Sequence, residues 1–156
     1  MRKCSARQMH TGDETMIPDL PDVAGRSLSG TTYRISRTEN ELVCTSVGMT
    51  PAADGSAHPI YFYVATQVGM GETVGGLCAI CNFDVKDGPL LGGCHVDFAE
   101  SLRVETDYQV TGEILSLTRK ASKKLGVIDL LEYSLALRVG DRTIAQVRNS
   151  WILPRG

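Results

Sequence analysis

The stretch HPIYFYVATQVGMGETVGG, residues 58–76, decides the fold because it is the best helix candidate in the chain. Apolar or small side chains recur around much of its circumference, which predicts a helix from His58 to about Gly75 that is buried on nearly all sides. Pro59 suits the first turn, where its missing N–H is no loss, and Ser56 is placed near the N-cap. The glycines at 69, 71, 75 and 76 weaken a helix, so we expect them to allow another backbone to approach closely.

Strand-like segments flank this helix on both sides. Two precede it, residues 26–36 and 41–49, with RTEN between them as a tight turn. The segments that follow it are 77–85, 92–102, 107–121, 126–139 and 142–153. In 126–139 the alternation of apolar and polar residues is typical of a sheet with one covered face. The expected fold class is therefore α+β, with an antiparallel sheet wrapped around one long central helix.

Length and composition point to a single soluble domain. The chain has 156 residues and a net charge of −2, which favours neither nucleic acid nor an anionic membrane as a partner. We assign residues 21–156 to one domain and 1–20 to a flexible leader. No apolar run reaches the length of about 18 residues that spans a bilayer, and the polar start lacks a secretory signal, so we expect a cytoplasmic protein. Five cysteines, an odd number, indicate reduced thiols.

Four features of the sequence carry a resemblance to a known family. They are DGSAHPIYFYVATQ (54–67), GGCHVDFAESLRVETDYQVTGEI (92–114), the closing two predicted strands (126–139 and 142–153) and the terminal IAQVRNSWILPR (144–155). Over about residues 25–155 the chain resembles hotdog-fold proteins of the MaoC-like dehydratase and thioesterase superfamily. MaoC-like proteins carry an F-x-x-P/S-L/V-x-V-x-D phrase before a strand that begins V-x-G-E, and FAESLRVETDYQVTGEI stands in that place. The resemblance implies a substrate that is an acyl thioester of coenzyme A or acyl carrier protein, no further cofactor, no metal, and a homodimer or higher oligomer.

The same resemblance points to catalytic residues in the loop that enters the helix. MaoC-like hydratases place an Asp and a His there to activate the water that adds to an enoyl thioester. Asp54 and His58 stand in that loop, four residues apart instead of five and without the usual Asn-Pro. The resemblance implies His58 as base or acid and Asp54 as its orienter, although Asp54 also fits a plain turn residue and His58 a plain helix start. Free N–H groups near Ile60 and Tyr61 would bind the thioester oxygen, since a helix N-terminus offers unpaired donors.

Substrate-binding candidates lie further along the chain. In a group of hotdog thioesterases a carboxylate follows the helix-opening His by nine residues, and here that position is Gln67. An amide can position a substrate but cannot act as a base near neutral pH. We expect Gln67 to face the ligand, and Tyr61 and Tyr63 either to donate hydrogen bonds or to pack as aromatic residues. Gly93 and Cys94, on a later strand, are expected to border the pocket. Cys78 and Cys81 are interpreted as core residues and not as half of a zinc site.

The leading functional interpretation is (R)-specific enoyl hydration or the reverse dehydration of a 3-hydroxyacyl thioester. One alternative is a thioesterase, or a conjugate-addition enzyme of secondary metabolism, that uses His58 without a carboxylate. Another is a non-catalytic subunit whose hotdog partner chain supplies the catalytic residues.

Overall fold

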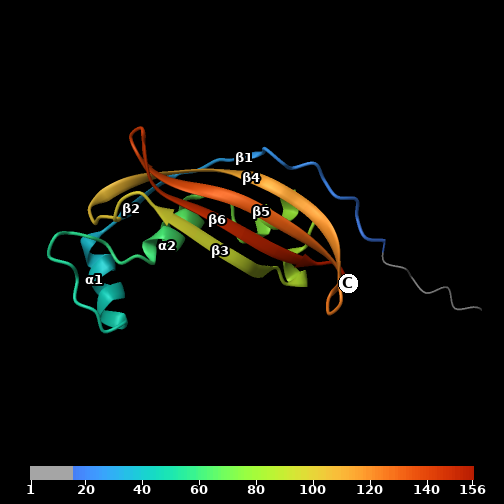
Figure 1. The fold of residues 1–156 in the computed structure, drawn as a ribbon, viewed down its shortest axis with the longest axis horizontal. Coiled ribbons are helices and arrows are strands. Elements are labelled where there is room, and N and C mark those ends of the chain that lie inside the picture. The colour runs from blue at the N-terminus through green and yellow to red at the C-terminus, as the bar shows by residue number, and fades with distance from the viewer. Residues whose placement is uncertain (1–15) are drawn as a thin grey trace, which may run out of the picture.

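The structure of the protein, a computed structural model, describes residues 16–156. A six-stranded antiparallel sheet curves around a helix, α2 (Tyr61–Gly69), that lies on its concave side (Figure 1). The strand order is β1-β4-β5-β6-β3, and β2 also pairs with β4. The strands are β1 (Ser27–Leu28), β2 (Thr32–Ile35), β3 (Leu90–Phe98), β4 (Thr106–Ser122), β5 (Gly126–Val139) and β6 (Arg142–Pro154). The α+β class with an antiparallel sheet around a helix is therefore confirmed.

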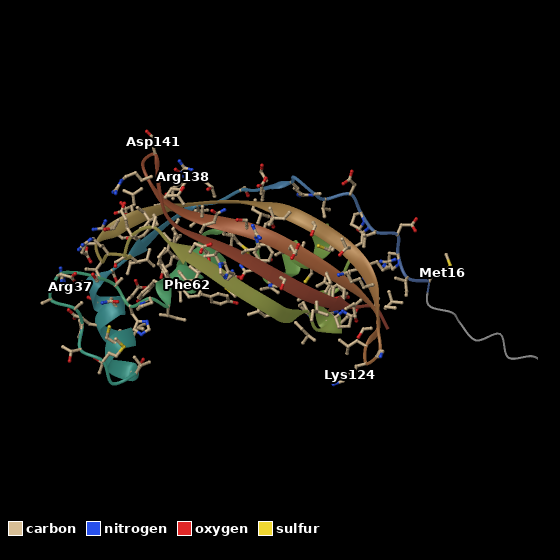
Figure 2. The ribbon with its side chains drawn as sticks, in the orientation of Figure 1. Met16, Arg37, Phe62, Lys124, Arg138 and Asp141 are labelled. Carbon is tan, nitrogen blue, oxygen red and sulfur yellow. The ribbon has the colours of Figure 1, made fainter. Side chains whose placement is uncertain are left out.

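The core lies between α2 and the concave face of the sheet. On β5 the side chains of Leu131, Tyr133, Leu135 and Leu137 are all buried there, as the alternation predicts. Lys124 marks the tip of the β4–β5 hairpin and Asp141 that of the β5–β6 hairpin, and the two tips lie at opposite ends of the sheet (Figure 2). The long strands thus give α2 a curved surface on which to pack.

Glycines allow the close packing of α2 and the turn that follows it. A Cβ on Gly69 would lie 2.4 Å from Cγ2 of Val110 on β4. A Cβ on Gly71 would lie 1.5 Å from the carbonyl oxygen of Ser29, and Gly71 has a φ of +78°. The close approach expected for these two glycines is confirmed.

Residues 41–46 are helical and 47–49 form the turn that follows, so the prediction of a strand over 41–49 was wrong. Helix α1 (Arg37–Ser46) begins where RTEN was interpreted as a turn. Its start is a capping box: the Glu39 N–H donates to Ser36 Oγ at 3.2 Å, and the Ser36 N–H donates to the Glu39 carboxylate at 3.4 Å. These bonds satisfy donors that a helix start otherwise leaves unpaired, which favours the helix.

The central helix is shorter than predicted, and a second helix follows it. Residues 58–60 form a tight turn before α2, and the left-handed backbone at Gly71 lies just after its end. Helix α3 (Val74–Ile80) then starts at Thr73, whose Oγ1 accepts from the Gly76 N–H at 2.9 Å. The segment 77–85 is therefore not a strand, because its apolar residues complete α3 and a turn, and the 3₁₀ helix η1 (Val85–Asp87) follows. Cys78 and Cys81 are buried in the core there.

The predicted strand 26–36 is divided into two short strands, β1 and β2, while the last four strand predictions agree with the structure to within a few residues. The segments 107–121, 126–139 and 142–153 correspond to β4, β5 and β6, while β3 starts before residue 92 and ends at Phe98. The expected leader, residues 1–20, falls mostly outside the described residues. No helix within residues 16–156 has both the length and the apolar character needed to cross a membrane.

Candidate active site

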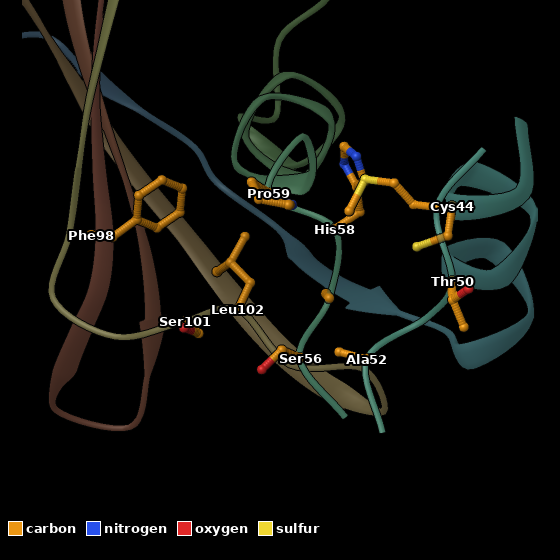
Figure 3. A pocket seen from close by; sticks show the side chains of 11 residues that line it. Cys44, Thr50, Ala52, Ser56, His58, Pro59, Phe98, Ser101 and Leu102 are labelled. Carbon is orange, nitrogen blue, oxygen red and sulfur yellow. The ribbon is translucent and has the colours of Figure 1, made fainter. Parts of the chain in front are cut away.

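A pocket of about 410 Å³ lies at the entry to α2 (Figure 3). It is enclosed by α1, the loop between α1 and α2, and the segment that leaves β3. Its lining is mostly apolar or small, and the residues are Cys44, Met49, Thr50, Ala52, Ser56, Ala57, His58, Pro59, Phe98, Ser101 and Leu102. Within the described part of the chain no carboxylate lines this pocket, and its ionisable side chains are those of His58 and Cys44, of which the imidazole is the expected catalytic group.

Two hydrogen bonds fix the position of His58. Its backbone N–H donates to Oδ1 of Asn40, a buried residue of α1, at 2.7 Å. The Ile60 N–H donates to Nδ1 of the imidazole at 3.1 Å. Because Nδ1 accepts a hydrogen bond, the neutral ring carries its hydrogen on Nε2. His58, which lies between Cys44 and Pro59 in Figure 3, is therefore arranged as a hydrogen-bond donor.

The structure does not bring Asp54 into hydrogen-bond contact with His58. The exposed Asp54 carboxylate instead accepts from the backbone N–H and from Oγ of Ser56, each at 2.9 Å. These bonds, the backbone one first, hold the pKa of Asp54 below its usual range. Arg103 Nη1 also donates to the Asp54 carbonyl oxygen at 2.9 Å. Asp54 and Ser56 thus close the turn that leads to His58, and Ser56 does not cap α2 as expected.

The backbone donors expected to bind the thioester oxygen are already engaged. The Ile60 N–H binds His58 Nδ1, and the Tyr61 N–H binds the His58 carbonyl oxygen at 3.2 Å. The donor left for a ligand by this local geometry is the Nε2–H of His58.

Three further residues expected to bind substrate lie on α2 or directly before it. Tyr61 is 2% exposed within the core, and burial, followed by the charge of Glu39, raises its pKa. Tyr63 is half-buried, and its ring packs edge-to-face on Phe62 with the centroids 6.2 Å apart. Ile60 is 40% exposed at the entry to the helix. None of these three side chains lines the pocket around His58.

Gln67 and Cys94 belong to a second group of polar residues, beneath the middle of the sheet. Tyr133 donates to Gln67 Oε1 at 3.5 Å, and Asn149, which is fully buried, lies opposite Tyr133 in the neighbouring strand. Cys94 lies opposite Asn149 on the edge strand β3, and Gly93 adjoins an irregularity in the β3–β6 pairing. Burial raises the pKa of both Tyr133 and Cys94. The sequence-predicted site residues therefore divide between two places.

Asn40, Tyr133 and Asn149 are not among the site residues predicted from the sequence. Asn40 follows the Ser36-x-x-Glu39 signature, which would have placed it on a helix and on the buried side of that helix with Cys44. Tyr133 lies within the segment 126–139, whose alternation predicted only a strand with one covered face. Asn149 occupies an inward position in the alternation of β6. A polar residue at such a position is unusual and indicates a buried polar site.

Comparison with known proteins identifies the fold. No protein-family model matches the sequence, and no curated protein matches it. A chain of the ChsH1–ChsH2 complex from Mycobacterium tuberculosis is similar with a TM-score of 0.67 and 14% identity, over 83% of this chain and 85% of that one. The HadBC (3R-hydroxyacyl-ACP dehydratase) complex from the same organism gives a TM-score of 0.62 and 12% identity, with coverages of 85% and 98%. The MaoC-like dehydratase of Rhodospirillum rubrum gives 0.61 and 12%, with coverages of 85% and 93%.

These similarities define the class of protein at the level of fold. The chain has the hotdog fold, and the neighbours that it matches include MaoC-like dehydratases. The resemblance seen in the sequence is confirmed to that extent.

Proposed function

We propose that this protein acts on acyl thioesters of coenzyme A or acyl carrier protein, as an (R)-specific enoyl hydratase or, in reverse, a 3-hydroxyacyl dehydratase. The observation that carries the proposal is His58, held by two hydrogen bonds in an apolar pocket at the entry to the helix of a hotdog fold. With the proposal go the expectations of a cytoplasmic homodimer or higher oligomer that needs neither metal nor cofactor.

In hydration, the oxygen of water bonds to the β-carbon and negative charge develops on the thioester oxygen until a proton reaches the α-carbon. A preorganised donor in an apolar pocket stabilises that charge strongly. The Nε2–H of His58 is such a donor, and a neutral imidazole can serve as an electrophile of this kind. Asp54 and Arg103 act in this scheme as positioning residues, since they fix the turn that leads to His58.

A base must also accept the proton of the attacking water. His58 can do so at Nε2 only if its hydrogen moves to Nδ1, which requires the bond from the Ile60 N–H to break. Otherwise the base comes from a second hotdog chain. The ChsH1–ChsH2 and HadBC neighbours are complexes, and here β3 is an edge strand with Leu90, Leu91 and Phe98 exposed. Such an edge is available for pairing with another chain.

The test follows enoyl absorbance and free thiol together, with crotonyl-coenzyme A and octenoyl-coenzyme A as substrates. We expect loss of enoyl signal without thiol release. His58→Ala should reduce kcat/KM by about 100-fold or more, as removal of one oxyanion donor does. The matched control is His95→Ala, because His95 is an exposed histidine of β3 that does not line the pocket.

The other outcomes separate the alternatives. Thiol release would assign a thioesterase that uses His58 without a carboxylate. Activity that appears only after a second hotdog chain is added would assign a non-catalytic or half-site subunit. Full activity in His58→Ala would remove His58 from the mechanism.

A further inference from the structure

Three polar side chains, Gln67, Tyr133 and Asn149, form a cluster between α2 and the sheet, which we call the amide cluster. Tyr133 pairs with Asn149 across β5 and β6, and Asn149 pairs with Cys94 across β6 and β3. Residues directly opposite in antiparallel strands point to the same face of the sheet. Tyr133, Asn149 and Cys94 therefore share the face that carries α2. The bond from the Tyr133 hydroxyl to Gln67 Oε1 joins this row to the helix.

Most of the hydrogen-bonding capacity of the two amides is unused. Among residues 16–156, Nε2 of Gln67 and both Nδ2 and Oδ1 of Asn149 are buried and have no hydrogen-bond partner. Buried polar atoms without partners are costly and are rare in native proteins. The unpaired atoms comprise two donor nitrogens and one acceptor oxygen. A hydroxyl group both donates and accepts, so it can bind to a donor and to an acceptor of this set at once.

The amide cluster lies close to the open edge of the sheet. Asn149 lies one strand in from β3, and Cys94, its neighbour in the row, is exposed. Leu91 and Phe98 share the face of β3 that carries Cys94, since they pair with the inward residues of β6, and they are 53% and 44% exposed. The Phe98 ring packs edge-to-face on Phe62 of α2 with the centroids 6.0 Å apart. An apolar border with a few polar groups beyond it is the usual composition of a ligand site.

We propose that the amide cluster binds a hydroxyl group on the acyl chain of the substrate, so that the protein selects hydroxylated, medium-length acyl thioesters over plain alkyl ones. This inference rests on the proposed function, because it places the thioester near His58 and the chain along α2. Gln67 follows Ile60 by seven residues, which is about 10 Å along a helix axis. The hydroxyl group therefore belongs far along the chain and not beside the thioester.

The experiment measures binding and does not depend on turnover. Calorimetry gives the Kd of octanoyl-coenzyme A and of derivatives hydroxylated at each of the last three chain carbons in turn. We expect at least one hydroxylated compound to bind the wild type about 10-fold more tightly than the plain one, the value of one well-placed hydrogen bond. Asn149→Leu should abolish this preference and keep the affinity for octanoyl-coenzyme A.

Two further variants complete the test. Gln146→Leu is the matched control, because Gln146 is exposed on the same strand as Asn149 and faces away from α2. It should leave the preference unchanged. Gln67→Leu, on the helix side, should weaken the preference and serves if Asn149→Leu does not fold.

The result would overturn the inference if the wild type bound all compounds equally or bound none, or if the preference survived both amide substitutions. Equal binding would mean that water fills the amide cluster. Preferential binding without turnover, either by this chain alone or after a second hotdog chain is added, would leave the inference standing and remove the proposed reaction. Turnover without any preference for a hydroxylated chain would overturn the inference and leave the proposed reaction standing.

Discussion

Two groups of buried polar side chains in the sheet, one around Asp129 and one around Asn149, differ in how completely they are paired. Toward the end of β5 near the β4–β5 hairpin, the fully buried Asp129 accepts from Arg119 Nε at 2.7 Å and from Arg155 Nε at 2.7 Å. Arg155 also donates to the carbonyl oxygens of Cys81 and Asn82, and its guanidinium lies over the Phe83 ring. In the amide cluster, by contrast, three buried polar atoms have no partner within the described chain.

The difference follows from charge. A buried carboxylate is tolerated only when cations and donors surround it, so the Asp129 group is complete by itself and ties β4, β5 and the C-terminal end of β6 to the turn after α3. A neutral amide costs much less when unpaired, so the protein can leave it free for a ligand. A complete cluster is therefore interpreted as structural, and an incomplete one as a binding site.

The largest effect that tests this contrast is on stability. Asp129→Asn should lower the free energy of unfolding by about 3–5 kcal/mol, because it leaves the buried Arg155 guanidinium without its counter-charge. Urea denaturation measures the loss. The control Asp107→Asn removes an exposed ion pair with Arg34 and should cost under about 1 kcal/mol. A loss no larger than that of the control would contradict the structural role of Asp129.

The buried amide of Asn40 lies outside both groups, and we expect its replacement to have an effect on stability between those of the Asp129 and Asn149 substitutions. Asn40→Leu removes the acceptor of the His58 N–H and should cost about 1–3 kcal/mol in the free energy of unfolding. It should also lower kcat/KM of the proposed reaction, since His58 loses its link to α1. Glu41→Leu, exposed on the same helix, should do neither. Unchanged stability and activity in Asn40→Leu would show that the bond does not position His58.

The Asp129 group also predicts a pH dependence. Burial raises the pKa of Asp129, but the hydrogen bonds from Arg119 and Arg155 outweigh it and hold that pKa below its usual range. A carboxyl group whose pKa is lowered in the folded state stabilises the folded protein fully at pH values above its unfolded pKa of about 4. This stabilisation is lost as the pH falls toward the pKa of the group in the folded state. The stability difference between wild type and Asp129→Asn should thus be constant near neutral pH and shrink below about pH 4, by at most about 1.4 kcal/mol per pH unit. Unfolding by urea at a series of pH values measures it, and a constant difference down to pH 3 would contradict it.

The smallest effect has the opposite sign. Asn149→Leu should raise the free energy of unfolding by about 1 kcal/mol, because it removes buried polar atoms that have no partner in the described part of the chain. Urea denaturation beside Gln146→Leu provides the comparison. A clear loss of stability would show that the Asn149 amide is paired in the folded protein.

Much of the fold could be predicted because it depends on local patterns. The alternation in 126–139 defined β5, and Gly69 and Gly71 were correctly interpreted as points of close approach. The prediction for 41–49 was wrong because it was based on the β-branched and apolar residues of this segment and did not take account of the capping box that starts α1. The length of the central helix was also wrong, because apolar residues continue through the Gly71 turn into α3 without a change in composition.

The candidate site was predictable only in part. The sequence indicated His58, and its side chain lines the pocket, but the sequence could not show that Nδ1 accepts from Ile60 or that Asn40 binds its backbone. Asp54 was paired with His58 from spacing alone, and the turn through Ser56 directs it elsewhere.

By itself, then, the sequence determined the class of fold and the entry to the central helix, because periodicity, glycine positions and turn residues act over a few residues. The tertiary structure alone decided which polar groups are paired. Asp129 contacts Arg119 and Arg155, while the Asn149 side chain has no hydrogen-bond partner among residues 16–156, because strands and helices distant in sequence bring side chains together or leave them apart.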